Sequence, residues 1–160
     1  MADITSFSEI EDEFMARISR IVWCTVTTVD RKDRPRARLL HPVWEGSTGW
    51  IATGRESFKA KHIAHNPHVS LSYWDPQHEQ VYAECRAEWV DDIAEKERLW
   101  EFYKATPPPL GYDLSMFWEN ADDPGYGLLR LDPWRIELSA LGDMMKGQAP
   151  QVWRPWSRTG

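Results

Sequence analysis

The stretch from residue 49 to residue 74 constrains the fold most, because it places a short cationic helix between two strand-like segments. Residues 50–53 and 69–74 are rich in aromatic and β-branched side chains, which favour strands. Between them, Gly54 breaks the chain, Ser57 stands at a helix N-cap position, and Asn66-Pro67 ends the helix. The pattern predicts a strand, a loop, a helix over 57–65 and a second strand.

Most of the other segments also read as short strands joined by turns. The predicted strands are 21–28, 35–44, 80–89, 127–131 and 135–141, and the predicted helices are 8–19, 92–106 and a short one near 116–119. The helix over 8–19 is expected to begin with a capping box from Ser8 to Glu11. Helices too few to alternate with the strands predict a mainly β, α+β fold, an antiparallel barrel with packed helices.

The chain is expected to form one domain over residues 1–160, with its core in about 21–141 and an irregular tail at 142–160. Ten tryptophans exceed what one small core can hold, so some are expected in a pocket or a subunit interface. Cys24 and Cys85 lack metal-site spacing and are expected to be buried thiols.

The net charge and the distribution of apolar residues limit the classes of binding partner that the chain is expected to have. The net charge of −6 argues against a nucleic-acid-binding surface, although basic residues cluster in 31–38 and 55–68. The acidic first residues lack the apolar run of a signal peptide, and no stretch is long enough for a membrane span. We therefore expect a cytoplasmic protein that binds neither nucleic acid nor membrane.

Two groups of cationic side chains predict a phosphate site. Arg36 and Arg38 alternate along one strand and so point to one face, together with Leu40. Lys59 and Lys61 follow Ser57 in the first turn of the short helix, where free N–H groups and the helix dipole favour an anion. The alternative is that the arginines only form a solvated face.

No side-chain constellation for catalysis is evident. The chain has five histidines but no HExxH or Cys/His pairing, and we expect no metal site. It also lacks GxSxG and GxGxxG. The catalytic residues therefore stay unidentified, and any chemistry is expected to come from a bound cofactor.

Six ordered blocks are similar to the pyridoxamine 5′-phosphate oxidase-like superfamily, the flavin-binding split β-barrels, which also contains deazaflavin-dependent reductases. The blocks read RARLLH at 36–41, WIAT at 50–53, SFKAK at 57–61, NPHVSL at 66–71, QVYAEC at 80–85 and WRIEL at 134–138. The resemblance covers about residues 21–141 and implies an antiparallel split β-barrel of the FMN-binding type.

The resemblance also implies roles for particular residues. Side chains along the flavin or its ring would be Arg36, Leu39, Leu40, Ile51 and Thr53, whereas Arg38 of the same strand matches a more variable place in the motif. Ser57 and Lys59 would bind the ribityl phosphate, and Lys61 is predicted to bind the cofactor nearby. Gln80 would approach the flavin from the second subunit of a homodimer that holds the cofactor at its interface.

Departures from the family pattern argue against a true pyridoxamine phosphate oxidase. Phe58 replaces the arginine of the phosphate segment, His41 replaces a lysine, Cys85 replaces a glycine, and the arginine-rich C-terminal motif is missing. We expect an oxidoreductase that binds FMN, or alternatively coenzyme F-420, and transfers a hydride to or from a small organic substrate. The other possibilities are a non-catalytic flavin or haem binding or sensor protein, and a stress-related protein without a cofactor.

Overall fold

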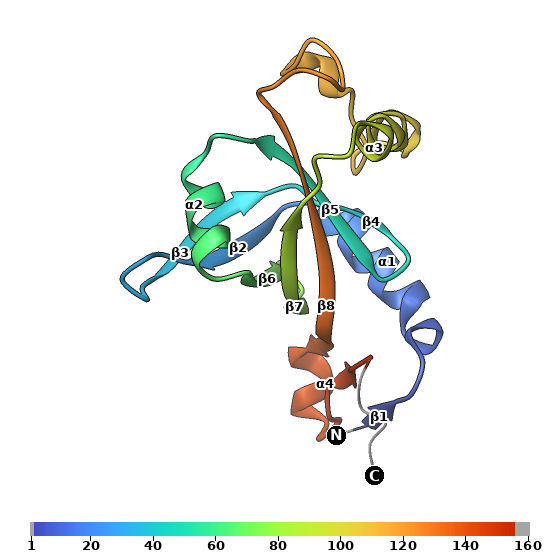
Figure 1. Ribbon diagram of the computed structural model, residues 1–160. Coiled ribbons are helices and arrows are strands. Elements are labelled where there is room, and N and C mark those ends of the chain that lie inside the picture. Colours follow the sequence, from blue (N-terminus) through green and yellow to red (C-terminus); the bar gives the residue numbers. More distant parts are fainter. Residues whose placement is uncertain (1, 156–160) are drawn as a thin grey trace.

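The computed structural model describes residues 2–155 and contains one mainly antiparallel sheet with helices packed around it (Figure 1). The strands are β1 (Ala2–Ile4), β2 (Cys24–Val29), β3 (Pro35–Leu40), β4 (Val43–Glu45), β5 (Thr48–Gly54), β6 (His68–Trp74), β7 (Glu79–Trp89), β8 (Tyr126–Ala140) and β9 (Gln151–Trp153). The helices are α1 (Glu11–Ile21), α2 (Phe58–His65), α3 (Ile93–Ala105) and α4 (Leu141–Met145), with 3-10 turns η1 (Phe7–Glu9) and η2 (Leu114–Met116).

The sheet closes into a split barrel through β8, its longest strand. The strands lie in the order β1-β9-β8-β7-β6-β2-β3, and β5, which pairs with β4, also pairs with the first half of β8. The second half of β8 pairs with β9. Only the β1–β9 pairing is parallel among the described strands. The predicted antiparallel split-barrel fold is confirmed.

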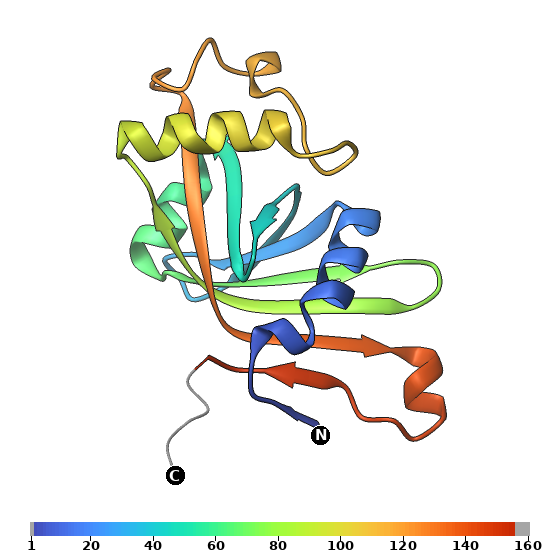
Figure 2. The ribbon, with the colours of Figure 1, turned by 90° about the vertical axis from the view of Figure 1, so that its right-hand side faces the viewer.

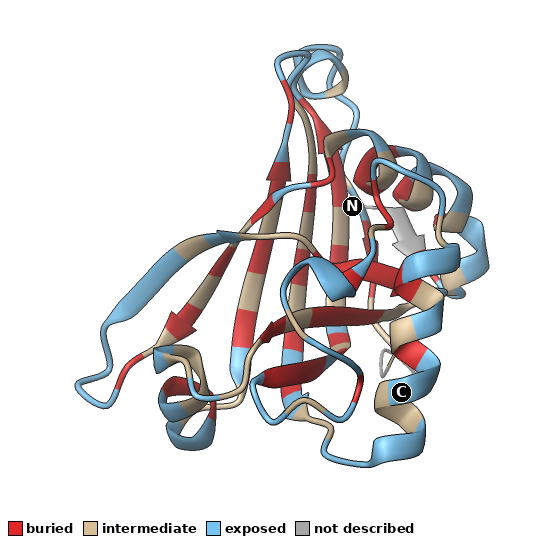
Figure 3. Ribbon diagram, turned by 90° about the horizontal axis from the view of Figure 1, so that it is seen from above, coloured by how far each residue is buried: buried red, intermediate tan, exposed pale blue. Residues whose placement is uncertain are grey.

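The core lies inside the barrel and under the helices. Residues alternate between buried and more exposed along β2, β6 and β7, as expected for strands with one face inward (Figure 3). Phe14 of α1 packs edge-on against Trp44 with ring centroids 4.9 Å apart. Helix α3 lies across one end of the barrel (Figure 2), where Tyr103 donates a hydrogen bond to the Trp50 carbonyl at 2.9 Å.

The outward face of β3, β2, β6 and β7 carries a row of partly exposed side chains. The register aligns Leu39, Thr25, Ser72 and Tyr82 across these four strands. Thr25, Ser72 and Tyr82 are only half-buried, whereas Leu39 is 67% exposed. We call this row, with its neighbours Ala37, Thr27, Ser70, Trp74 and Gln80, the outer sheet face.

Two predicted boundaries at the N-terminal end are wrong. The capping box forms one turn earlier than expected, because Ser6 and Glu9 have the same spacing: Glu9 Oε1 accepts from the Ser6 N–H at 2.8 Å. Phe7, in the 3-10 turn that this capping box begins, packs against the buried ring of Phe14 in α1. Helix α1 continues to Ile21, so the strand expected from residue 21 begins only at Cys24.

Proline explains two further differences. The strand expected over 35–44 is divided into β3 and β4 because Pro42 has no N–H to donate to a ladder. Conversely, Asp132-Pro133 does not divide β8. A β-bulge opposite Glu84 and Cys85 takes up Trp134 as an extra residue and tolerates the proline.

The expected irregular tail is wrong over its described part, 142–155. Helix α4 and strand β9 lie there, and β9 fills the space between β8 and β1. Three-residue strands carry too little periodicity to be recognised. The short helix expected near 116–119 is instead the 3-10 turn η2 at Leu114–Met116. No helix within residues 2–155 is long and apolar enough to cross a membrane.

Candidate functional site

The predicted cationic groups meet in a pocket of about 450 Å³ between β3 and the start of α2. We call it the cationic pocket. Its walls are formed by Arg36, Arg38, Glu56, Ser57, Phe58, Lys59, Lys61 and His62. Five of the residues predicted for cofactor binding, namely Arg36, Arg38, Ser57, Lys59 and Lys61, therefore lie together.

The local fold explains why these side chains meet. Residues 36 and 38 lie opposite Thr28 and Val26 of β2, so both arginines share the face on which α2 packs. Helix α2 starts after Ser57, which has extended backbone angles of φ −71° and ψ 163° as an N-cap residue does. It ends at His65, just before Asn66-Pro67. The strand and the helix start thus form opposite walls of one pocket.

The pocket concentrates more positive than negative charge, with four Lys/Arg residues and one Glu in its lining. Burial, and then the charge of Arg38, lower the pKa of Lys59. Burial, and then the charge of Arg36, lower the pKa of Arg38. Glu56 is the single acidic lining residue, and Asp30 lies at the edge, 3.8 Å from an Arg36 nitrogen. Like charges held together in partial burial destabilise one another, so an anion bound between them is stabilised.

Ser57 supplies a polar atom that suits such an anion. Its hydroxyl oxygen is buried without a hydrogen-bond partner, and it does not cap its own helix. A buried hydroxyl is normally paired, so the unpaired Ser57 hydroxyl leaves hydrogen-bonding capacity next to the four cationic residues of the pocket. The first turn of α2 adds backbone N–H groups and the positive end of its dipole. These residues fit a phosphate group, which accepts hydrogen bonds and carries negative charge.

The other predicted residues lie outside this pocket. Leu39 faces away from Arg38 and is exposed on the outer sheet face, where Gln80 also lies. Ile51 and Thr53 are buried in β5, with exposed fractions of 2% and 8%. Leu40 is half-buried against the core. The structure therefore separates the predicted set into a phosphate-type pocket, a buried strand and the outer sheet face.

A second, smaller cationic pocket of about 210 Å³ adjoins the first. Its walls are Asp30, Arg31, Lys32, Arg34, Phe58, Lys61 and His62, the last three of which line both pockets. Phe58, which is 78% exposed, stands between them, and the Lys61 ammonium lies 5.8 Å from its ring centroid. Arg55, which belongs to the basic cluster over residues 55–68, lies outside both pockets, pairs with Asp91 at 3.1 Å and stacks on Trp89.

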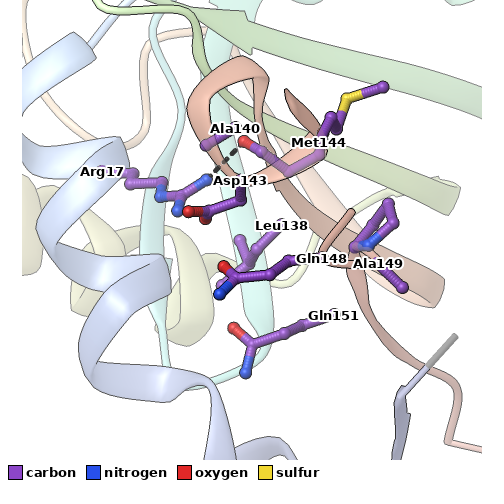
Figure 4. A pocket seen from close by; sticks show the side chains of 10 residues that line it. Arg17, Leu138, Ala140, Asp143, Met144, Gln148, Ala149 and Gln151 are labelled. Carbon is purple, nitrogen blue, oxygen red and sulfur yellow. Dashed lines mark hydrogen bonds between the residues drawn. The ribbon is translucent and has the colours of Figure 1, made fainter. Parts of the chain in front are cut away.

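A third pocket, of about 280 Å³, lies between α1 and the end of β8 (Figure 4). Buried Arg17 donates from Nη1 to the carbonyls of Ser139 at 2.7 Å and Gln80 at 3.0 Å, and from Nε to Glu13 at 2.7 Å. Its other walls belong to α4 and the turn before β9. Arg17 thus fixes the backbone at Gln80, a residue whose side chain belongs to the outer sheet face.

Sequence reasoning missed one buried residue at the cationic pocket. Thr28 Oγ1 accepts a hydrogen bond from Arg38 Nη1 at 2.9 Å and lies 2.9 Å from His62 Nδ1. The strand register could have indicated this contact, because Thr28 lies directly opposite Arg36 and diagonally opposite Arg38. It could be used only once the β2–β3 register was known.

The antiparallel sheet that closes through β8 has the architecture of a split β-barrel, and the cationic pocket lies between its strand β3 and the start of α2. A sequence model of the family described as pyridoxamine 5′-phosphate oxidase matches residues 10–139. The chain belongs to this family. General stress protein 26 of Bacillus subtilis is 26% identical over 117 residues, which cover 71% of this chain and 76% of that protein.

Solved structures share the fold over most of their length. A protein of Clostridium acetobutylicum related to general stress protein 26 has a TM-score of 0.71 at 15% identity, covering 91% of this chain and 94% of that one. An FMN-binding protein of Nostoc punctiforme has a TM-score of 0.65 at 16% identity, covering 93% and 96%.

Two similar structures differ in their named ligands. An F-420 reductase has a TM-score of 0.55 at 18% identity and covers 76% of this chain and 94% of its own. The heme storage protein HutZ of Vibrio cholerae has a TM-score of 0.56 at 15% identity and covers 78% and 89%. At these identities the likeness establishes the fold.

Proposed function

We propose that this protein is an oxidoreductase that binds FMN and transfers a hydride between that cofactor and a small organic substrate. The observation that carries the proposal is the cationic pocket with the unpaired, buried hydroxyl of Ser57. Membership of the family and the fold shared with an FMN-binding protein support the choice of cofactor.

The residues of the chain bind and orient the cofactor. Arg36, Arg38 and Lys59 neutralise its phosphate, and the Ser57 hydroxyl and the first turn of α2 hydrogen-bond its oxygens. A bound flavin supplies the hydride chemistry itself. No acid or base side chain is then needed for the hydride transfer itself.

The active form is proposed to be a homodimer that holds the cofactor between its subunits. The outer sheet face supports this, because it is broad, lined by small residues such as Thr25 and Ser72, and carries the exposed Leu39 and Trp74. Gln80 lies on the same face, where it would reach the partner's site rather than its own. Exposed apolar side chains on an uncovered sheet are typical of subunit interfaces.

Coenzyme F-420 is the alternative cofactor, and the second cationic pocket favours it. Coenzyme F-420 also carries a phosphate, and its polyglutamate tail would add negative charge beyond that group. Arg31, Lys32 and Lys61 line a pocket next to the phosphate position and would meet such a tail. FMN ends at its phosphate and would leave the second pocket unused.

A non-catalytic role is the remaining alternative. Similar proteins are named for general stress and heme storage, and Phe58 stands where the family's phosphate segment carries an arginine. The same departures argue against a true pyridoxamine phosphate oxidase. A carrier or sensor would hold its ligand without turning over a substrate.

Titration of the purified, cofactor-free protein distinguishes these functions. FMN and coenzyme F-420 are added separately and their fluorescence is followed, with riboflavin as the control that lacks a phosphate. The proposal expects FMN to bind and riboflavin to bind much more weakly. Acceptor-dependent oxidation of the reduced cofactor then identifies an enzyme, whereas binding without turnover identifies a carrier. Equal binding of FMN and riboflavin would contradict the phosphate site.

A further inference from the structure

A short, buried chain of hydrogen bonds joins two residues that line the cationic pocket. Thr28, only 1% exposed, stands between Arg38 of β3 and His62 of α2. Its hydroxyl oxygen is 2.9 Å from Arg38 Nη1 and 2.9 Å from His62 Nδ1. His62 is itself 8% exposed. Both neighbours of Thr28 line the cationic pocket.

The chemistry of the three groups determines the direction of the hydrogen bonds. A guanidinium can only donate, so the Thr28 oxygen accepts from Arg38. The one hydroxyl proton of Thr28 is then free to be donated to His62 Nδ1. That arrangement requires a neutral imidazole with its proton on Nε2. Thr28 therefore fixes Arg38 toward the pocket and selects the tautomer of His62.

The charges around His62 are mostly positive. Arg36 and Arg38 of β3, Lys59 of α2 and Asp30 at the end of β2 act on the His62 imidazole. The two pockets that His62 lines also contain the charged residues Arg31, Lys32, Arg34, Glu56 and Lys61. Burial, followed by Arg38 and Arg36, lowers the pKa of His62, and Asp30 opposes this shift. Burial and the positive charge of the pocket therefore both favour the neutral imidazole in the free protein.

We propose that Thr28 and His62 are positioning residues for the phosphate, which hold Arg38 in place, and that phosphate binding is accompanied by uptake of one proton at His62. The inference rests on the proposed phosphate site. A bound dianion offsets Arg36, Arg38 and Lys59, so the cost of charging the imidazole falls. The proton comes from solvent and goes to Nδ1. The Thr28 oxygen, with two lone pairs, then accepts from both His62 and Arg38.

The sign of the pH effect follows from linkage. Burial and the cationic side chains lower the pKa of His62 in the free protein. A bound phosphate offsets the cationic charge, so in the proposed complex this pKa rises and more protons are bound. The affinity for FMN should therefore increase as the pH falls from the pKa of His62 in the complex toward its pKa in the free protein. The phosphate monoester itself loses negative charge below about pH 6. The His62→Gln variant keeps a hydrogen-bonding side chain but does not titrate. The difference between the parent and this variant therefore excludes the effect of phosphate protonation, which both proteins share.

Two measurements on the full chain test the proposal. In FMN titrations, Thr28→Val should raise Kd about tenfold, whereas Thr28→Ser should restore binding. Thr48→Val, in β5 and away from the pocket, is the matched control and should not change Kd. In calorimetric titrations near pH 6.5, run in buffers of different ionisation heats, the parent should take up more protons than His62→Gln.

The outcomes separate this inference from the proposed function. If FMN binding depends on Lys59 but Thr28→Val binds like the parent, or if the parent and His62→Gln take up equal numbers of protons, the inference is wrong and the phosphate site stands. If the parent binds FMN no better than riboflavin, both are wrong. Val retains the β-branched shape preferred in strands, and thermal unfolding verifies that each variant is folded.

Discussion

Lys59 provides the sharpest test of the phosphate assignment. Its ammonium is half-buried, and both burial and the charge of Arg38 lower its pKa. An exposed ion pair would contribute about 0.2–1 kcal/mol, and breaking a fully buried one would cost about 3–5 kcal/mol. A partly desolvated hydrogen bond to a charged phosphate lies between these limits, so Lys59→Ala should weaken FMN binding by about 1.5–3 kcal/mol.

That loss corresponds to an increase in Kd of about 10- to 150-fold, which a fluorescence titration resolves easily. Lys104→Ala, on the exposed surface of α3, is the matched control and should bind FMN like the parent. Riboflavin should bind the parent and Lys59→Ala equally, because it has no phosphate. The free variant should be at least as stable as the parent, since repulsion with Arg38 is removed. Unchanged FMN affinity in Lys59→Ala would refute the assignment.

Three further predictions address the hydroxyl, the dimer and the choice of cofactor. Ser57→Ala should leave thermal stability unchanged, because the hydroxyl has no protein partner, yet should weaken FMN binding by about 1 kcal/mol in the same titration. Thr25→Arg on the outer sheet face should yield a monomer by sedimentation, whereas Ala94→Arg on α3 should not; a dimer in both would exclude this face as the interface. Replacing Arg31 and Lys32 together by Ser should weaken binding of coenzyme F-420 and leave FMN binding unchanged, and equal losses for both cofactors would rule out the second pocket as a tail site.

Much of the fold could be predicted from local patterns. Alternation and β-branching identified β2, β5, β6 and β7, and the Asp92 cap identified the start of α3, where its side chain accepts from the Glu95 N–H at 3.0 Å. These signals lie within a few residues of one another, so no tertiary information is needed. The predicted element boundaries were wrong where tertiary packing determines them. Ile21 ends helix α1 instead of starting a strand, and Trp134 lies in a bulge within the continuous strand β8.

The cationic pocket was predictable in part for the same reason. Arg36 and Arg38 share a face by strand periodicity, and Ser57 and Lys59 share a helix start. Their convergence depends on how α2 packs on β2, which the ordered family motifs implied but local patterns cannot supply. Thr28 shows the limit clearly, because its contact with Arg38 and His62 depends on strand register and on a helix from another part of the chain.

Leu39 and Gln80 lie apart from the cationic pocket, and their position bears on the proposed homodimer. Both residues lie on the outer sheet face, so within one chain they cannot contact a ligand in the cationic pocket from the same side. A second subunit docked on that face would bring them to the site. The proposed homodimer would therefore account for the distance of both residues from the cationic pocket of their own chain.

The most direct test of the central claim is a crystal structure of the protein grown with FMN. We expect the phosphate to lie in the cationic pocket, within hydrogen-bonding distance of Ser57 Oγ and Lys59 Nζ, and Arg38 to be held by Thr28. A flavin phosphate bound anywhere else, with the Ser57 hydroxyl still unpaired, would contradict it.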